Sequence, residues 1–185
     1  VGSAGRPLEV GLTALAVVGP VTGMVFPLLG ALGWTPYDWR GGAVLAAAYA
    51  ACFPLVGLVV RKVRPSTAEV TTAKQLAGAT GALVVAAVVA ALCSESVPIV
   101  SRILLALAVV GPGEETLFRG VVQTRLDLAF GRPWRLFGAD LGWGWILASL
   151  LFGLAHLTSP SMPWQGGWAL WTVFAGLLFG YLRAK

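Results

Sequence analysis

Long apolar runs constrain the fold of this chain more than any other feature of its sequence. Residues 8–32, 41–60 and 76–92 form runs of about 17–25 residues, the length that a helix needs to cross a bilayer. Three more runs follow at 97–122, 143–157 and 166–182, and charged side chains interrupt the first of them. We therefore predict an all-α polytopic membrane protein with about six transmembrane helices.

The composition supports this class and argues against soluble ones. Hydrophobic residues make up 57% of the chain and charged residues only 11%, whereas soluble domains carry about 25% charged residues. The net charge is +5, but the basic residues flank the apolar runs, as orienting residues of membrane helices do. We expect the lipid bilayer as a partner and no nucleic acid.

The distribution of Lys and Arg predicts the orientation. With six helices, one side holds the N-terminus, the 61–74 and 125–142 loops and the C-terminal end. The basic residues on that side are Arg6, Arg61, Lys62, Arg64, Lys74, Arg125, Arg132, Arg135, Arg183 and Lys185. Only Arg40 and Arg102 fall on the other side. The positive-inside rule then places both ends in the cytoplasm. We expect a multi-pass protein of the plasma membrane, and the residue usage favours a bacterial one.

The fourth apolar run contains the segment GPGEETLFRG, which places two glutamates in a hydrophobic stretch. A helix flanked by Arg102 and Arg125 is long enough to span the hydrocarbon, and Glu114 then lies near its midplane, about 17 Å from the cytoplasmic flank. In an alternative reading, GPGEE begins a juxtamembrane helix and its glutamates favour the helix N-terminus.

Helical spacing gives the two glutamates different roles. Glu115 and Arg119 are four residues apart, so they lie on one face of an α-helix and can form an ion pair. Glu114 is about 100° around the helix from that pair. A carboxylate inside a membrane is by default a functional-site hypothesis.

The predicted partner of Glu114 is His156, the only histidine of the chain. In LLFGLAH, Phe152 and His156 are four residues apart on one helix face, and His156 lies about 17–20 Å from the cytoplasmic side. Glu114 and His156 therefore share a level on consecutive antiparallel helices. Such a pair suits general-base catalysis on water, or could supply two ligands of a metal, although catalytic zinc usually has three protein ligands. A lone histidine can also be a packing residue.

The segments EETLFRG at 114–120 and FGLAH at 152–156 resemble the first two motifs, EExxxR and FxxxH, of the CAAX protease and bacteriocin-processing family of intramembrane proteases. The resemblance implies that Glu114 activates water, that Glu115 and Arg119 support it, and that His156 shares the water or a metal. Phe118 and Phe152, which stand within the two motifs, are expected to support the site. If a divalent metal such as zinc is used, Glu114 and His156 are its implied ligands.

The resemblance also implies a division of the chain. Residues 1–96 would form three N-terminal transmembrane helices and residues 97–185 the protease core. We expect this core to be truncated, because no second histidine is present for the family's third motif. The implied function is an intramembrane endopeptidase that acts on a peptide or protein at the membrane. An inactive membrane scaffold or immunity-type protein is the alternative.

Overall fold

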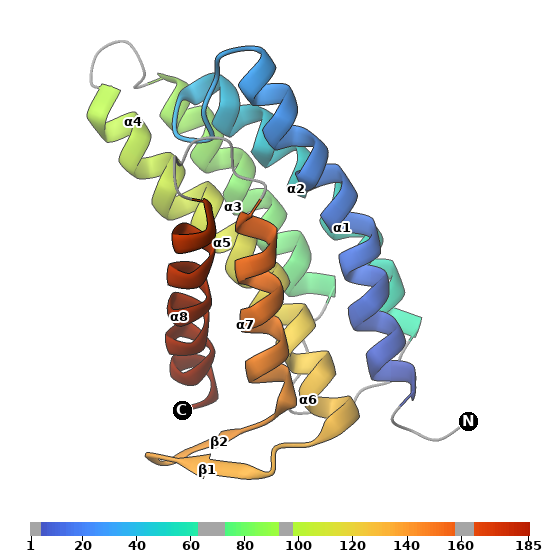
Figure 1. The fold of residues 1–185 in the computed structure, drawn as a ribbon. Coiled ribbons are helices and arrows are strands. Elements are labelled where there is room, and N and C mark those ends of the chain that lie inside the picture. Colours follow the sequence, from blue (N-terminus) through green and yellow to red (C-terminus); the bar gives the residue numbers. More distant parts are fainter. Residues whose placement is uncertain (1–4, 63–72, 93–97, 158–164) are drawn as a thin grey trace. The chain divides into compact units, whose positions relative to one another are not determined.

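The computed structural model describes residues 5–62, 73–92, 98–157 and 165–185 (Figure 1). Its long helices are α1 (Gly5–Ala31), α2 (Trp39–Lys62), α3 (Ala73–Leu92), α7 (Trp143–His156) and α8 (Gln165–Ala184). A further helical run contains α4 (Pro98–Leu105), the π-helix η1 (Ala106–Val110), α5 (Gly111–Glu115), the π-helix η2 (Thr116–Gln123) and α6 (Thr124–Phe130). The strands β1 (Trp134–Leu136) and β2 (Ala139–Leu141) lie between α6 and α7.

The predicted helical class is confirmed, since each of the six apolar runs coincides with a helix or a helical run. In the described part of the chain, two segments, Pro7–Ala31 and Trp39–Leu58, are long and apolar enough to cross a membrane. The apolar helices Ala77–Leu92 and Trp143–His156 are shorter. The number of six transmembrane helices, and their orientation, therefore stay predictions.

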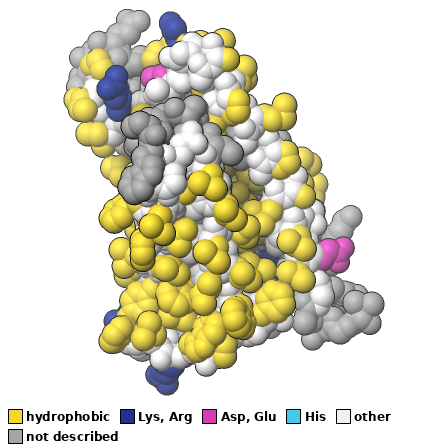
Figure 2. Space-filling view, viewed as in Figure 1, with side chains coloured by type: hydrophobic (Ala, Val, Ile, Leu, Met, Phe, Trp, Pro, Cys, Tyr) yellow, Lys and Arg dark blue, Asp and Glu magenta, His cyan; other side chains and the backbone are white. Residues whose placement is uncertain are grey.

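Large apolar side chains cover much of the surface of the helices, as the yellow side chains of Figure 2 show. Met24, Leu107 and Trp171 are 74%, 72% and 62% exposed. Soluble proteins rarely expose contiguous apolar surface over several elements. Lipid is the solvent in which these side chains are stable, which supports the membrane assignment.

The helices pack into two compact units. Of the described residues, the first contains those up to Leu15, Lys62 and those of Leu117–Lys185; the second contains those of Ala16–Arg61 and Thr71–Thr116. These units follow packing rather than chain order. The division of the chain at residues 1–96 and 97–185 stays a prediction, and residues 93–97 lie outside the described residues.

In the second unit, α2, α3 and α4 meet through small residues and buried hydrogen bonds. Asp38 caps α2, accepting a 2.9 Å hydrogen bond from the backbone N–H of Gly41. Gly42 lies against the side chain of Leu105, so α2 approaches α4 closely at this point. The Ser101 hydroxyl donates a 2.9 Å hydrogen bond to the Ala90 carbonyl and connects α4 to α3. These contacts place the start of the charged run against α2 and α3.

In the first unit, α7 and α8 lie side by side (Figure 1). The indole N–H of Trp145 donates a 2.7 Å hydrogen bond to the Leu177 carbonyl of α8. Gly153 and Gly176 are positions where the helices are in close contact, because an added Cβ would meet atoms of the neighbouring helix. Small residues at such positions let membrane helices approach and gain van der Waals contact.

The segment 125–142, predicted to be a loop, is instead helical to Phe130 and then forms an antiparallel hairpin. Gly131, with φ of +80°, ends α6. The hairpin register pairs Trp134 with Leu141, Arg135 with Asp140 and Leu136 with Ala139. The sequence indicated a loop because the segment is short, charged and rich in glycine. The alternation of apolar and charged residues that marks a strand covers only three positions on each strand.

The contact of α7 with α8 can be tested at Gly153. A Cβ at this position would lie 2.8 Å from the Ala169 carbonyl oxygen and would collide with Val173. Gly153→Ala should lower the free energy of unfolding by about 1–3 kcal/mol, as overpacking of a well-packed core does. Gly166→Ala on α8 is the matched control, because nothing lies within 4 Å of its Cβ position. Thermal unfolding of the detergent-solubilised chain measures both; equal unfolding temperatures would contradict this packing.

Candidate active site

The helical run from Pro98 to Phe130 is continuous through GPGEE. The helix therefore does not begin at Gly111, as the alternative reading required. Pro112 has no backbone N–H to donate, and the preceding turn is a π-helix, in which the N–H of Gly111 reaches the Ala106 carbonyl. π-Helical turns inside longer helices are rare and frequent at functional sites.

The second π-helix changes the predicted spacing of the motif. It extends over Thr116–Gln123 and contains Arg119. Its hydrogen bonds join residues five apart, so the chain winds more loosely than in an α-helix. The predicted roles of Glu114 and Glu115 assumed α-helical spacing here, and they stay predictions.

Within the second unit, Glu114 lies near two tyrosines that the sequence analysis did not single out. Gly113 packs against the ring of Tyr49, because an added Cβ would lie 2.6 Å from a ring carbon of that residue. Tyr49 is 3% exposed and interacts electrostatically with Glu114. Tyr37, in the loop before α2, has a pKa raised by burial and further by the charge of Glu114. Tyr49 is the single polar ring in the apolar stretch AAAYAACF, and this isolated position could have marked it as a candidate site residue.

Within the first unit, residues from the two motifs meet. The rings of Phe118 and Phe152 lie edge to face with centroids 5.1 Å apart. The guanidinium of Arg119 lies over the Phe152 ring, with Cζ 4.6 Å from the centroid. Both Arg119 and Phe152 are buried. A cation over an aromatic face is attracted by the ring quadrupole, and more strongly when desolvated. These contacts bring η2 and α7 together at the predicted motif residues.

His156 completes this cluster. Its ring lies edge to face with Phe152, with centroids 4.7 Å apart, and 6.3 Å from the ring of Trp168 on α8. Its Nδ1 lies 2.8 Å from the Phe152 carbonyl oxygen. A carbonyl only accepts hydrogen bonds, so Nδ1 carries the proton in this contact, and Nε2 is the acceptor nitrogen of the neutral ring. The aromatic neighbours fix the plane of the ring.

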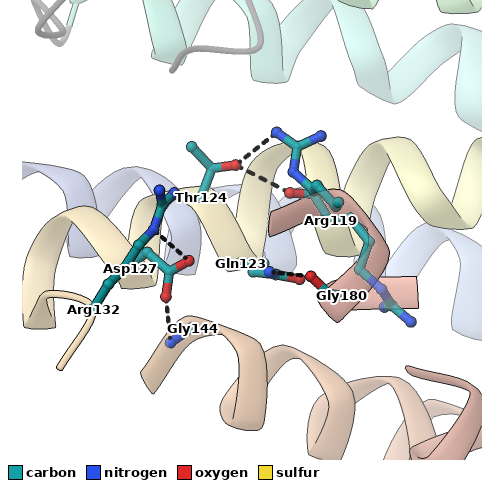
Figure 3. Close-up of polar contacts among 8 residues, drawn as sticks. Arg119, Gln123, Thr124, Asp127, Arg132, Gly144 and Gly180 are labelled. Atoms are coloured by element: carbon teal, nitrogen blue, oxygen red, sulfur yellow. Dashed lines mark hydrogen bonds and ion pairs between the residues drawn. The ribbon is translucent and has the colours of Figure 1, made fainter. Parts of the chain in front are cut away.

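A set of buried polar contacts holds η2 and α6 against the neighbouring helices (Figure 3). The Thr124 hydroxyl donates to the Arg119 carbonyl at 3.1 Å and accepts a 3.0 Å hydrogen bond from Arg183. The Gln123 amide donates to the Gly180 carbonyl at 3.2 Å. Gly180 has no space for a side chain, since its Cβ would lie 2.8 Å from the Gln123 amide oxygen. Gln123 and Thr124 therefore position the end of the first motif against α8.

Asp127 connects the same run to the start of α7. One carboxylate oxygen accepts a 2.9 Å hydrogen bond from the Gly144 N–H, and the other is 3.2 Å from Nε of Arg132 (Figure 3). The first N–H groups of a helix have no partner inside the helix, so this carboxylate caps α7. The cap holds α7 to α6, and the Gln123 contact holds α8 to η2.

Arg125 differs from its predicted role as a flank of the membrane span. It lies inside α6 and is 2% exposed. Its Nη1 and Nη2 have no hydrogen-bond partner among the described residues. Its Cβ lies 3.3 Å from the Cβ position of Gly11, so α1 passes close to α6 here. The sequence could not predict this burial, because it depends on α1.

The comparisons with known proteins agree with the motif cluster. A family model described as type II CAAX prenyl endopeptidase Rce1-like matches residues 76–185, which is more than half of the chain. The chain belongs to this family. Comparison with curated proteins and with solved structures gave no match. The Rce1-like match confirms the resemblance drawn from the two motifs, and the chain is thus a membrane protein of a protease family.

The structure brings together four of the six predicted site residues of this family member. Phe118, Arg119, Phe152 and His156 share one cluster in the first unit. Glu114 and Glu115 belong to the second unit. The pairing of Glu114 with His156 and of Glu115 with Arg119 therefore stays a prediction, as do the roles of all six residues.

The donors of the described residues do not fit a metal site of the usual catalytic kind. No group of three or more His, Cys, Asp or Glu side chains lies together in the described part of the chain. Catalytic zinc is generally held by three protein ligands. A divalent metal on Glu114 and His156 remains a prediction.

Proposed function

We propose that this chain is an intramembrane endopeptidase that cleaves a peptide bond near the membrane by glutamate-activated water. The contact of Arg119 with Phe152, beside His156, carries the proposal, because it joins residues of the two family motifs in one cluster. The Rce1-like match to residues 76–185 supports it independently.

Glu114 is the proposed general base. It takes a proton from a water molecule as that water attacks the carbonyl carbon of the scissile peptide bond, and the proton then passes to the leaving amine. A carboxylate screened from bulk water is more basic than one in solution, which suits this role. Tyr49, buried beside Gly113, interacts electrostatically with this carboxylate.

His156 is the second side chain that we propose to bind the attacking water molecule. Its Nδ1–H is held by the Phe152 carbonyl, so Nε2 can accept a hydrogen bond from the attacking water and orient it. Phe152 and Trp168 hold the imidazole plane, and Arg119 holds Phe152 in turn. In this scheme Arg119 and Glu115 are positioning residues.

The proposed substrate is a membrane-anchored peptide or protein, and the proposed setting is a multi-pass protein of a bacterial plasma membrane. The test is cleavage of membrane-anchored reporter peptides by the purified chain in proteoliposomes, with the products identified by mass spectrometry. A parental chain that binds such peptides without cutting any of them would contradict the endopeptidase proposal and favour the inactive scaffold.

Replacement of His156 by phenylalanine distinguishes a catalytic role of this side chain from a role in packing. His156→Phe keeps an aromatic ring between Phe152 and Trp168 but removes both nitrogens. We expect it to lower the cleavage rate by a factor on the order of 10²–10⁴, the range for a lost acid–base group. The unfolding temperature should stay close to the parental one. Parental cleavage rates in His156→Phe would show that His156 serves only as a packing residue.

A further inference from the structure

The hairpin of β1 and β2 has two chemically different faces. Cross-strand partners share a face, so Arg135 and Asp140 lie on one face, while Trp134, Leu136, Ala139 and Leu141 lie on the other. The charged face is open, with the two side chains 80% and 70% exposed and only 3.9 Å apart. The other face is entirely apolar, so the hairpin is amphipathic.

The protein covers only half of the apolar face. Ala139 and Leu141 on β2 are 0% and 1% exposed, because β2 packs against α8. Leu136 and Trp134 on β1 remain 42% and 38% exposed. The Trp134 ring packs edge to face on Trp143 of α7, with centroids 5.0 Å apart, so the β1 side of the apolar face is partly covered and partly exposed.

The turn of the hairpin carries an apolar residue in an unfavourable backbone conformation. Phe137 has φ of +45° and Gly138 has φ of +84°, which is the pattern of a two-residue turn with both central residues left-handed. Asn or Gly normally occupies the first of these positions, and a bulky residue there is an outlier. Phe137 is nonetheless 81% exposed, more than any other large apolar residue of the described chain. Packing inside the protein does not explain this residue, which indicates an external contact.

The apolar surface of the hairpin continues onto α8. The Tyr181 hydroxyl donates a 3.2 Å hydrogen bond to the Phe137 carbonyl and holds the turn beside the end of α8. Leu178, Phe179 and Leu182 on this part of α8 are 56%, 44% and 58% exposed. Figure 2 shows yellow side chains extending over this lower part of the first unit, with dark-blue basic side chains at its edge. The exposed apolar surface of α8 thus reaches the hairpin.

We propose that the hairpin of β1 and β2 binds the membrane surface, with Phe137, Leu136 and Trp134 among the acyl chains and Arg135 at the lipid phosphates. Aromatic residues favour the interface, and long basic side chains reach from an apolar surface to the headgroups. Asp140 faces Arg135 on the charged face, but the 3.9 Å separation and the high exposure of both residues leave Arg135 available to phosphate.

A lipid occupant fits these observations better than a peptide strand. The open edge of β1 could accept an extended peptide, as exposed edges do. However, β1 has only three residues and offers few backbone hydrogen bonds. Such pairing would also leave Phe137, in the turn, unexplained.

A photo-crosslinking experiment identifies what touches the turn. The full chain carries benzoylphenylalanine in place of Phe137, or in place of Asp140 as the control on the charged face, and is reconstituted in nanodiscs with and without anionic lipid. We expect lipid adducts at position 137 to exceed those at position 140 by at least about threefold. Equal lipid adducts at the two positions, or adducts only to an added reporter peptide, would overturn the proposal.

The lipid composition of the adducts tests whether Arg135 contributes to the binding of anionic lipid. In mixed nanodiscs, anionic lipid should be enriched about twofold in the position-137 adducts relative to its share of the bilayer. Arg135→Glu should remove this enrichment, whereas Arg102→Glu, also exposed but in the second unit, should not. Enrichment that survives Arg135→Glu would overturn the assignment of Arg135.

The Phe137→Asn variant distinguishes the contribution of Phe137 to membrane contact from its contribution to folding. Asn suits the left-handed position, so the unfolding temperature in detergent should stay equal or rise. In nanodiscs, tryptic cleavage after Arg135 should become at least about threefold faster, because the turn leaves the lipid. Unchanged cleavage in nanodiscs would contradict the proposal. None of these measurements depends on proteolytic activity.

Discussion

Glu114→Gln should abolish peptide cleavage by the chain while its helices stay folded. Glutamine has the shape of glutamate but cannot take a proton from water, so the attacking hydroxide is not formed. We expect the cleavage rate of membrane-anchored peptides to fall by a factor on the order of 10⁴, the upper range for a lost general base. The initial rate of product release in proteoliposomes measures this loss.

The control for Glu114→Gln is the same substitution at Glu9. Glu9 is exposed on α1, and its carbonyl accepts a local hydrogen bond from Thr13. Glu9→Gln should cleave at the parental rate. A Glu114→Gln variant that also cleaves at the parental rate would show that Glu114 is not the base, and the assignment of the first motif would then be wrong.

Arg119→Ala should give the largest loss of stability among single substitutions in the motif cluster. The guanidinium is 2% exposed, lies over the Phe152 ring and reaches α8, where a Cβ at Gly176 would lie 3.1 Å from Nη2. Removing it opens a cavity between η2, α7 and α8. It also removes the predicted partner of Glu115, and breaking a buried pair costs about 3–5 kcal/mol. Thermal unfolding in detergent, followed by circular dichroism, measures the effect.

Arg119→Lys and Arg135→Ala test the origin of this loss. Lysine keeps the charge but lacks the planar guanidinium that stacks on a ring, so Arg119→Lys should recover only part of the stability. Arg135 is 80% exposed, and its replacement by alanine should leave the unfolding temperature unchanged. An Arg119→Ala variant that unfolds at the parental temperature would contradict the structural role of the stacked guanidinium.

The motif cluster could be predicted from the sequence in part. Phe152 and His156 share a face of α7 because they are four residues apart in a regular α-helix, and the structure shows their rings in contact. The pairing of Glu115 with Arg119, which rests on the same argument, stays a prediction, because the two residues belong to different units. The sequence did not predict that Arg119 lies in the π-helix η2. A π-turn forms where neighbouring helices and a proline change the local hydrogen bonds, and the pattern of apolar residues contains no sign of it.

Tyr49 and Arg125 show why burial is harder to predict than secondary structure. Tyr49 lies beside Gly113, more than sixty residues further along the chain, because α2 packs against α5 at this point. Arg125 was expected at the edge of a span, yet α1 passes it at Gly11 and it is buried. Both outcomes depend on which helices become neighbours, and no local sequence feature specifies that.

The sequence by itself determined the helical class, the positions of the six helical runs and the family, since the length of an apolar run, its turn residues and two short motifs are all local properties. The tertiary structure alone decided that Arg119 stacks on Phe152, that Gln123 and Thr124 hold the motif against α8, and that 134–141 forms a hairpin with an exposed aromatic turn. These features arise from contacts between distant segments, whose free energy depends on the packed arrangement rather than on any one stretch of the chain.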